Sequence, residues 1–588
     1  MNVGNGTTHA GIAAGGGLIG AHDLTLLAVS TDTMTTTAQN GAPGGSEITP
    51  DVAVSLSNVT TGAEIASGPA ITVTGAVNAS ATQQATVTTT AQAAATGVSA
   101  AIGAGLALTV ANHTASATLS RDLHATGDVK LSSEQASTTA SDAHASAGGA
   151  SSGPSNVTQQ TANQRTLADA NAPAGGGTGA TGTPAADTSS GAVSVAAAIG
   201  VNVATISSSA TIGNALSVSS GGVLALKATG TTHASSTADG SVVTGAAVGV
   251  GAAVAINLAD VLTQASVGTG GSSTSDTLAV EAAMNSASSD GTNRFSATAT
   301  SGAGTGSVGV AGSLALNIVN PTSSTLLGGT YARGPPLGPT SGDVSLLATS
   351  VADSQASATA GVTGAGFGAS VALNLVTDTT HAALSDGSTL TNSHDLTVKA
   401  SSTDSATTVA KTGAAGGSVS LAPGVAVTLA TVTTTAGLGT GTLTTLSGAL
   451  LVQADQTASA STTASGSAAG GAAVGAELAL TVANDSALAT SARSLNVAGS
   501  ATFQATGASS ATGSSTASAT GAPGDGQPGA PVGGVDGQVA GERSTASTAA
   551  SANGGSGSGS TLTPSASTSS GTISVAAAIT VTISNAGA

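Results

Sequence analysis

Histidine is the side chain in this sequence best suited to metal binding or proton transfer. Eight are present, at His9, His22, His113, His124, His144, His233, His381 and His394. No two of them form an HExxH or other i, i+4 pair, the spacing that brings two imidazoles onto one helix face. His9 and His381 are copies of one repeat position. We therefore expect surface or turn histidines and no metal centre built on them.

Aspartates are the remaining candidates for binding a cation. The chain contains neither the GGxGxD pattern nor the carboxylate spacing of an EF-hand. Asp128, Asp343, Asp395 and Asp525 occur singly at turns, where Asp is favoured because its side chain bonds to nearby backbone. We expect turn-forming aspartates and no cofactor, with weak surface calcium binding as the alternative.

The residue types do not indicate a nucleophile for covalent catalysis. The 588 residues include no Cys, and no GxSxG elbow stands between a strand and a helix. Serine and threonine are too frequent for a nucleophile to be singled out, and nothing supplies a positioned base and orienting acid. We expect that the chain is not an enzyme.

Composition excludes further classes of function. Aromatic residues make up 1% of the chain and charged residues 6%, with a net charge of −18. The few Lys and Arg are scattered singly, so the clustered cations needed to bind nucleic acid or anionic lipid are missing. The apolar run Val242–Leu258 is Gly/Val-rich and interrupted by Thr and Asn, which favours a strand over a membrane-inserted segment.

An alternating apolar run centred on a small polar residue, here called the anchor, recurs throughout the chain. Anchor spacings of 53 to 60 residues give a unit of about 55, and two intervals are longer, at 93 and 101 residues. Asn2 begins a truncated first copy. The complete copies are centred on Ser55, Thr109, Asn202, Asn257, Asn317, Asn374, Thr428, Thr481 and Thr582.

A longer period of about 372 residues relates the two halves of the chain. LALTVAN at Leu106–Asn112 returns at Leu478–Asn484, so a block of six units is duplicated. The predicted organisation is β-repeat units over 1–144, 191–512 and 571–588. The two long intervals hold Gly/Ser/Pro-rich insertions at 145–190 and 513–570, which we expect to be flexible because they bury little surface. Both outer units are read as truncated, as in an internal fragment of a longer protein.

Period-2 alternation, abundant Val and Thr, and Gly or Asp turns predict strands rather than helices. Repeated strand units that cannot bury a face alone predict an all-β, parallel β-solenoid; stacked long antiparallel hairpins, with tips such as Ala414–Gly417, are the alternative. Each unit is either one wide coil or two to three narrow rungs. Stacking aligns Asn202, Asn257, Asn317 and Asn374, which form either an inward amide ladder or an outward polar row.

The cadence VALNLVTDTTHAALSDGSTL followed by HDLTVKASS, over Val371–Ser402, resembles the repeats of very large bacterial exoproteins. These are the filamentous-haemagglutinin-like and autotransporter-type adhesins. The resemblance covers nearly the whole chain outside the insertions. It implies a β-solenoid that is secreted or held at the bacterial cell surface, associated with the outer membrane, with a role in adhesion or biofilm attachment.

The leading hypothesis is therefore a non-enzymatic structural or adhesive stalk. Its expected surface of Thr, Ser and Asn would contact a host or neighbouring cell, glycans or an abiotic surface, without nucleic acid and without inserting into a membrane. The rival is an ice- or carbohydrate-binding solenoid, suggested by TVTTTAQ from Thr86 and TVTTTAG from Thr431. A poorly folded fragment is the third possibility, because solenoids normally need caps.

Overall fold

The computed structural model describes residues 1–148, 193–284, 291–334, 342–416, 418–519 and 573–588. In this part of the chain the regular structure is entirely β, and all strand pairs are parallel. The predicted parallel β-solenoid is confirmed. None of these residues belongs to a helix that is long and apolar enough to span a membrane.

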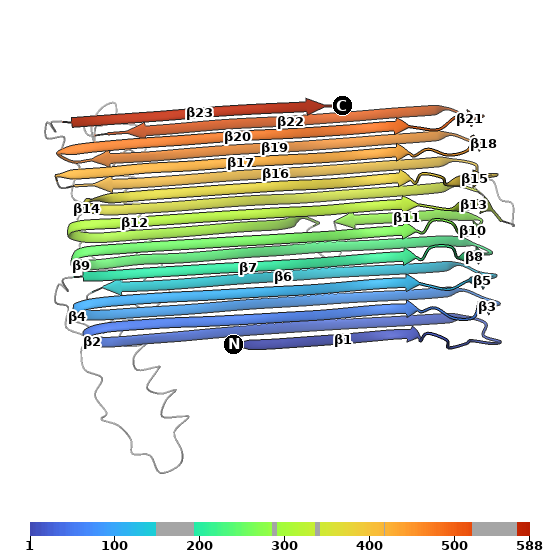
Figure 1. The fold of residues 1–588 in the computed structure, drawn as a ribbon, viewed down its shortest axis with the longest axis horizontal. Coiled ribbons are helices and arrows are strands. Elements are labelled where there is room, and N and C mark those ends of the chain that lie inside the picture. Colours follow the sequence, from blue (N-terminus) through green and yellow to red (C-terminus); the bar gives the residue numbers. More distant parts are fainter. Residues whose placement is uncertain (149–192, 285–290, 335–341, 417, 520–572) are drawn as a thin grey trace, which may run out of the picture.

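Each repeat unit forms one wide, flattened coil with two long arms and a short third side (Figure 1). The arms run in opposite directions and stack on the arms of neighbouring units, so they build two long sheets that face each other. We call them the anchor sheet, which carries the anchors, and the opposite sheet. The register follows the sequence period: Ser55 pairs with Thr109, and Thr428 pairs with Thr481.

The strands fall into four groups. Five run through both arms of a coil: β2 (Leu24–Ile65), β4 (Val77–Leu119), β9 (Val223–Val267), β12 (Asn293–Leu327) and β14 (Val344–Leu384). Others belong to the anchor sheet alone: β1 (Asn2–Ile12), β7 (Val193–Ile212), β17 (Val419–Leu438), β20 (Ala472–Ser491) and β23 (Ile573–Gly587). The opposite sheet also contains β6 (Val129–Gly148), β11 (Thr277–Met284), β16 (Leu396–Ala415), β19 (Leu450–Ala469) and β22 (Ala501–Ser518). The short third side is made by β3 (Ile71–Val73), β5 (Leu123–Ala125), β8 (Ser217–Ser220), β10 (Ser272–Ser275), β13 (Thr330–Arg333), β15 (Thr389–Thr391), β18 (Thr444–Leu446) and β21 (Leu495–Val497).

The antiparallel hairpin alternative is wrong. Of its predicted tip, Ala414 and Ala415 belong to β16, and Gly417 lies outside the described residues. Gly416 lies between β16 and β17 with φ of 109°, a conformation that favours glycine. The two strands that it joins do not pair with each other. β16 pairs with β14 and β19, whereas β17 pairs with β14 and β20, so the chain crosses from one sheet to the other at this turn.

The interior changes in composition along the coil. Near the turn between the arms it is filled by alanine, as at Ala107 and Ala253, because two sheets that face each other closely leave room only for small side chains. Near the short third side it is filled by larger residues such as Ile65 and Leu119, since three walls enclose a wider space there. The polar anchors lie between these two regions.

The predicted insertions lie mostly outside the described residues. The strands that precede the two insertions, however, end later than the sequence predicts. β6 extends to Gly148 and β22 to Ser518, so residues 145–148 and 513–518 belong to the opposite sheet. Inward and outward small residues still alternate over these positions. Their high Gly and Ser content made them look like part of the insertions.

Candidate functional site: the interior ladders and the outer sheet faces

The four anchor asparagines point into the solenoid and form an amide ladder along the stack. Asn202 Nδ2 donates to Asn257 Oδ1 at 2.8 Å, and Asn257 Nδ2 donates to Asn317 Oδ1 at 2.8 Å. Asn317 Nδ2 donates to Asn374 Oδ1 at 3.1 Å. All four side chains are fully buried. Of the two orientations that the sequence leaves open, the structure has the inward one.

The hydroxyl anchors form a zigzag between the two sheets instead. Thr109 Oγ1 donates to Thr89 Oγ1 at 2.7 Å, and Thr89 Oγ1 donates to Ser55 Oγ at 2.7 Å. The duplicated block repeats the arrangement: Thr481 Oγ1 donates to Thr462 Oγ1 at 2.7 Å, and Thr462 Oγ1 donates to Thr428 Oγ1 at 2.6 Å. Thr582 continues the row on β23, in register with Thr481. The anchors other than Thr582, which is exposed on the last strand, are thus structural groups that satisfy one another inside the coil.

Two buried arginines bind backbone at the end of the coil next to the short third side. Arg493 Nη1 donates to Ser388 O at 2.8 Å, and its Nη2 donates to Ser385 O and Thr440 O, both at 3.1 Å. Arg121 is its counterpart in the first block and donates to backbone oxygens in the same way, for example from Nη2 to Ala13 O at 3.0 Å. Neither arginine was predicted from the sequence to have a structural role. The 372-residue period, which aligns them, is the signal that could have found them.

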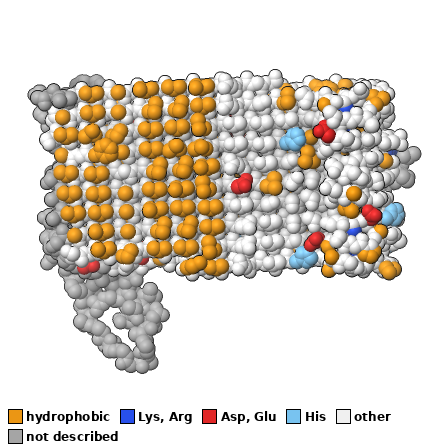
Figure 2. All heavy atoms as spheres, viewed as in Figure 1, with side chains coloured by type: hydrophobic (Ala, Val, Ile, Leu, Met, Phe, Trp, Pro, Cys, Tyr) orange, Lys and Arg blue, Asp and Glu red, His pale blue; other side chains and the backbone are white. Residues whose placement is uncertain are grey.

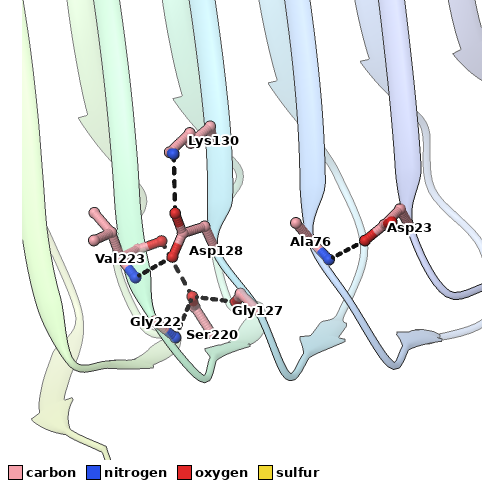
Figure 3. Close-up of polar contacts among 8 residues, drawn as sticks. All are labelled: Asp23, Ala76, Gly127, Asp128, Lys130, Ser220, Gly222 and Val223. Carbon is pink, nitrogen blue, oxygen red and sulfur yellow. Dashed lines mark hydrogen bonds and ion pairs between the residues drawn. The ribbon is translucent and has the colours of Figure 1, made fainter.

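The turn aspartates cap the backbone of the next coil (Figure 3). Asp23 Oδ1 accepts the Ala76 N–H at 2.7 Å, and Asp128 Oδ1 accepts the Val223 N–H at 3.0 Å. Asp128 also pairs with Lys130 at 2.9 Å, and this contact lowers the pKa of its carboxyl. Where a coil carries Asp at this position, the carboxylate accepts a backbone N–H of the next coil that would otherwise lack a partner.

Among the described residues, one group brings three potential metal ligands together: Asp343, His394 and Asp395. His394 Nδ1 lies 2.9 Å from Asp343 Oδ1 and 3.3 Å from Asp395 Oδ1. The same carboxylates act as caps, since Asp343 Oδ1 accepts the Asp395 N–H at 3.2 Å and Asp395 Oδ1 accepts the Ala449 N–H at 2.6 Å. Capping accounts for their position without a metal. Asp525 lies outside the described residues.

The expectation that all histidines lie at the surface or in turns is wrong for His113. Its ring is fully buried between the two sheets, with Nε2 3.0 Å from Ser57 Oγ and Nδ1 2.8 Å from Ser137 Oγ. Burial lowers its pKa to about 4, so the ring is neutral at physiological pH. His113 follows the inward anchor Thr109 by an even number of residues on the same strand, which places it on the inward side as well.

Several carboxyl groups are also buried between the sheets, which the sequence analysis did not expect. Ser350 Oγ donates to Asp378 Oδ2 at 2.6 Å, whereas neither carboxyl oxygen of the neighbouring Asp404 has a partner at hydrogen-bond distance among the described residues. Burial raises the pKa of both carboxyls, and the charge of Asp378 raises that of Asp404 further. Asp404 and Asp485 line a cavity of about 10 Å³, close to the smallest that holds one water.

Half of the outer face of the anchor sheet is apolar. The outward side chains form columns along the stack, one residue from each strand, because the strands are in register. On β9 the six columns nearest the turn are Val248, Val250, Ala252, Val254, Ile256 and Leu258. Figure 2 shows these columns covering the left half of this face. Among the described side chains at the corresponding positions of the other coils, Ser46 and Gly312 are the only ones not built of hydrocarbon.

The other half of this face is polar. The next column contains mainly Asn and Thr, as at Asn58, Asn112 and Thr205, and Asn112 Nδ2 donates to Asn58 Oδ1 at 3.2 Å. The following columns contain mainly Thr and Ser, together with His9 and His381 and leucines such as Leu262 and Leu488 (Figure 2). This half has the expected surface of Thr, Ser and Asn. The expectation is wrong for the other half of the anchor sheet, whose outer face is apolar.

The outer face of the opposite sheet is mainly polar, although Leu27 and Val29 are exposed on its first strand. It contains Thr and Ser columns together with ion pairs between neighbouring coils, such as Lys227 with Glu281 and Lys399 with Asp455, both at 3.1 Å. The two Thr-rich segments lie on different faces: the outward threonines of the segment from Thr86 belong to the opposite sheet, and those of the segment from Thr431 to the anchor sheet. They do not combine into one regular Thr array of the kind that ice binding needs.

The fold and these faces define a class of protein, the parallel β-solenoids, here with one wide coil for each repeat unit. Comparison of the chain with protein-family models, with curated proteins and with solved structures finds no match.

Proposed function

We propose that this chain is a non-enzymatic structural and adhesive segment of a large bacterial protein that is secreted or held at the cell surface. The observation that carries the proposal is that polar side chains repeat in register from coil to coil on the opposite sheet and on half of the anchor sheet. Such a face offers many equivalent weak contacts to an equally repetitive partner, and many weak contacts together bind strongly.

The polar columns suit hydroxylated partners. Their Thr, Ser, Asn and Gln side chains each supply donors and acceptors at a spacing of about 4.8 Å along the stack. Glycans on a host or neighbouring cell present hydroxyl groups, and so do many abiotic surfaces. The interior ladders and the arginine contacts hold neighbouring coils together, which supports a load-bearing role for the stack. The resemblance to adhesins supports a location at the outer membrane surface.

An attachment assay tests the function. The full chain, biotinylated at its C-terminus and bound to streptavidin beads, is flowed over mucin-coated glass, cellulose, polystyrene and cultured epithelial cells. We expect more beads to resist detachment than albumin-coated beads on at least one of these surfaces. Attachment no greater than that of albumin on all four would overturn the proposal.

A matched pair of variants locates the adhesive face. Thr35, Thr88, Thr407 and Thr512 lie in one outward column of the opposite sheet. Changing all four to Glu adds charge and removes the hydroxyls, so attachment should fall, whereas changing all four to Ser keeps the hydroxyls and should preserve it. If both variants attached equally well, the adhesive surface would be assigned to the polar half of the anchor sheet instead.

A further inference from the structure

The apolar half of the anchor sheet is too large to be an ordinary surface feature. Its six columns span about 33 Å along the strands and its nine coils about 43 Å along the stack, which gives roughly 1,400 Å². The largest apolar patch on a typical monomer is about 300–600 Å². Side chains in the middle of the stack are partly exposed, with Ile199 at 42% and Phe367 at 40%. A face of this size is expected to be covered.

We infer that the face is covered by a second copy of this chain, packed sheet against sheet. The shape of the face supports this occupant. On β9, Ala252 lies between the larger Val250 and Val254, and the corresponding position is Ala or Gly in every other coil except two, which carry Pro50 and Pro423. The small residues form a groove along the stack, with an apolar ridge on each side.

A two-fold axis along the stack, placed between the Ala252 and Val254 columns, makes the face complementary to itself. It sets the Ala252 column against the Val254 column of the second copy, Val250 against Ile256, and Val248 against Leu258. All six columns are then covered, and each groove receives a ridge. An interface in which the same patch serves both subunits closes into a dimer.

The area and the charges fit this arrangement. Two such faces bury about 2,800 Å² together, above the 1,200–2,000 Å² of a standard stable interface. No described side chain in the six columns is charged. Binding to a lipid surface instead is favoured by Lys, Arg and Trp around an apolar patch, and the chain has 10 Lys and Arg in all and no Trp. The axis leaves the polar half of the face outside the interface, so dimerisation adds to the proposed adhesive function without depending on it.

The mass of the full chain in solution tests the dimer. Light scattering coupled to gel filtration at micromolar concentration should give twice the chain mass of 53.7 kDa. Changing Val254 and Leu314, outward neighbours on adjacent coils, to Lys should give a monomer. The control changes Gln264 and Ser324, outward neighbours on the polar half of the same strands, to Lys and should remain dimeric. A monomeric wild type, or loss of the dimer in the control alone, would overturn the inference.

Cross-linking provides a second test that does not depend on the lysine variants folding. Because the chain has no Cys, Ala252→Cys and Gln264→Cys each introduce a single thiol. A short bismaleimide should link two Ala252→Cys chains and should not link two Gln264→Cys chains. Equal linking of both variants would overturn the proposed face. Flotation of a monomeric wild type with phosphatidylcholine and phosphatidylglycerol vesicles would also overturn it, in favour of a lipid surface.

Discussion

Arg121 and Arg493, which are 372 positions apart, make equivalent contacts in the two blocks of the solenoid. Each guanidinium reaches backbone carbonyl oxygens 105 and 108 residues earlier in the chain, at Gly16 and Ala13 for Arg121 and at Ser388 and Ser385 for Arg493. Each also binds carbonyls of the coil in between. One side chain thus joins three consecutive coils.

Replacing Arg493 by Lys should loosen this end of the coil. A lysine keeps the charge but lacks the planar set of donors that reaches several carbonyl oxygens at once. We expect a loss of about 1–3 kcal/mol in stability, with faster amide hydrogen exchange around Ser388 and Thr440. Lys399→Arg, at an exposed ion pair, is the control. Unchanged exchange in Arg493→Lys would contradict the joining role.

The amide ladder should be sensitive at its centre. Asn257→Ala removes the acceptor of Asn202 and the donor to Asn317, both of which are buried. We expect a loss of about 2–4 kcal/mol, because buried polar groups lose their partners. Urea unfolding followed by circular dichroism measures the loss. Asn320→Ala, at an exposed position of the same sheet, should cost far less, and equal losses would show that the ladder contributes nothing.

The buried Glu477 should make stability depend on pH. Thr412 Oγ1 donates to its Oε1 at 2.7 Å, its Oε2 has no partner among the described residues, and burial raises its pKa to about 7. Because the folded pKa exceeds the usual 4.5, the folded state keeps a proton that the unfolded state releases between pH 4.5 and 7. The contribution of this group to stability therefore falls as the pH rises through that window.

Glu477→Gln resembles the protonated carboxyl and isolates this effect. The variant should be more stable than the wild type by about 2–3 kcal/mol near pH 8 and should show little gain near pH 4. Thermal or urea unfolding at the two pH values gives the difference. The control is Glu281→Gln, at an exposed ion pair. A gain of equal size at both pH values would rule out titration of Glu477.

Calcium should leave the solenoid unchanged if the turn aspartates are caps. Asp395→Ala removes the acceptor of the Ala449 N–H and should cost about 1 kcal/mol. Neither EDTA nor added calcium should shift the unfolding midpoint of the wild type. A calcium-dependent rise in that midpoint, absent from Asp395→Ala, would show that Asp343, His394 and Asp395 hold a metal.

The sequence predicts the repeat register well, because the anchors mark one position in every coil. Pairs such as Ser55 with Thr109 and Asn257 with Asn317 could be aligned by spacing alone. The width of the coil could not, since a unit of about 55 residues accommodates either one wide coil or several narrow ones. The direction of the anchors also stayed open, because both alternating sets of residues in these strands are small or apolar.

That ambiguity explains why the apolar outer face was not predicted. In a strand such as β7, Ala196 and Ala198 point inward while Val195 and Ile199 point outward. Larger apolar residues ordinarily mark the buried side, but two closely packed sheets accept only small ones between them. The buried Asp404 and Glu477 were missed for a related reason: no local pattern distinguishes an inward carboxyl from an outward one.

The central structural claim is that each repeat unit forms a single wide coil, which places residues one unit apart side by side. Thr86 and Thr138 are register partners on the outer face of the opposite sheet. In the cysteine-free chain, Thr86→Cys with Thr138→Cys should close an intramolecular disulfide on mild oxidation, because adjacent strands bring the two Cα atoms within about 5 Å.

The control is Thr86→Cys with Glu134→Cys, in which the second thiol is four residues out of register. Peptide mapping without reductant measures both products. Efficient closure of the first pair and none of the second is the predicted result. Absence of a disulfide in the first pair, or equal closure of both, would contradict the wide coil and the two faces that depend on it.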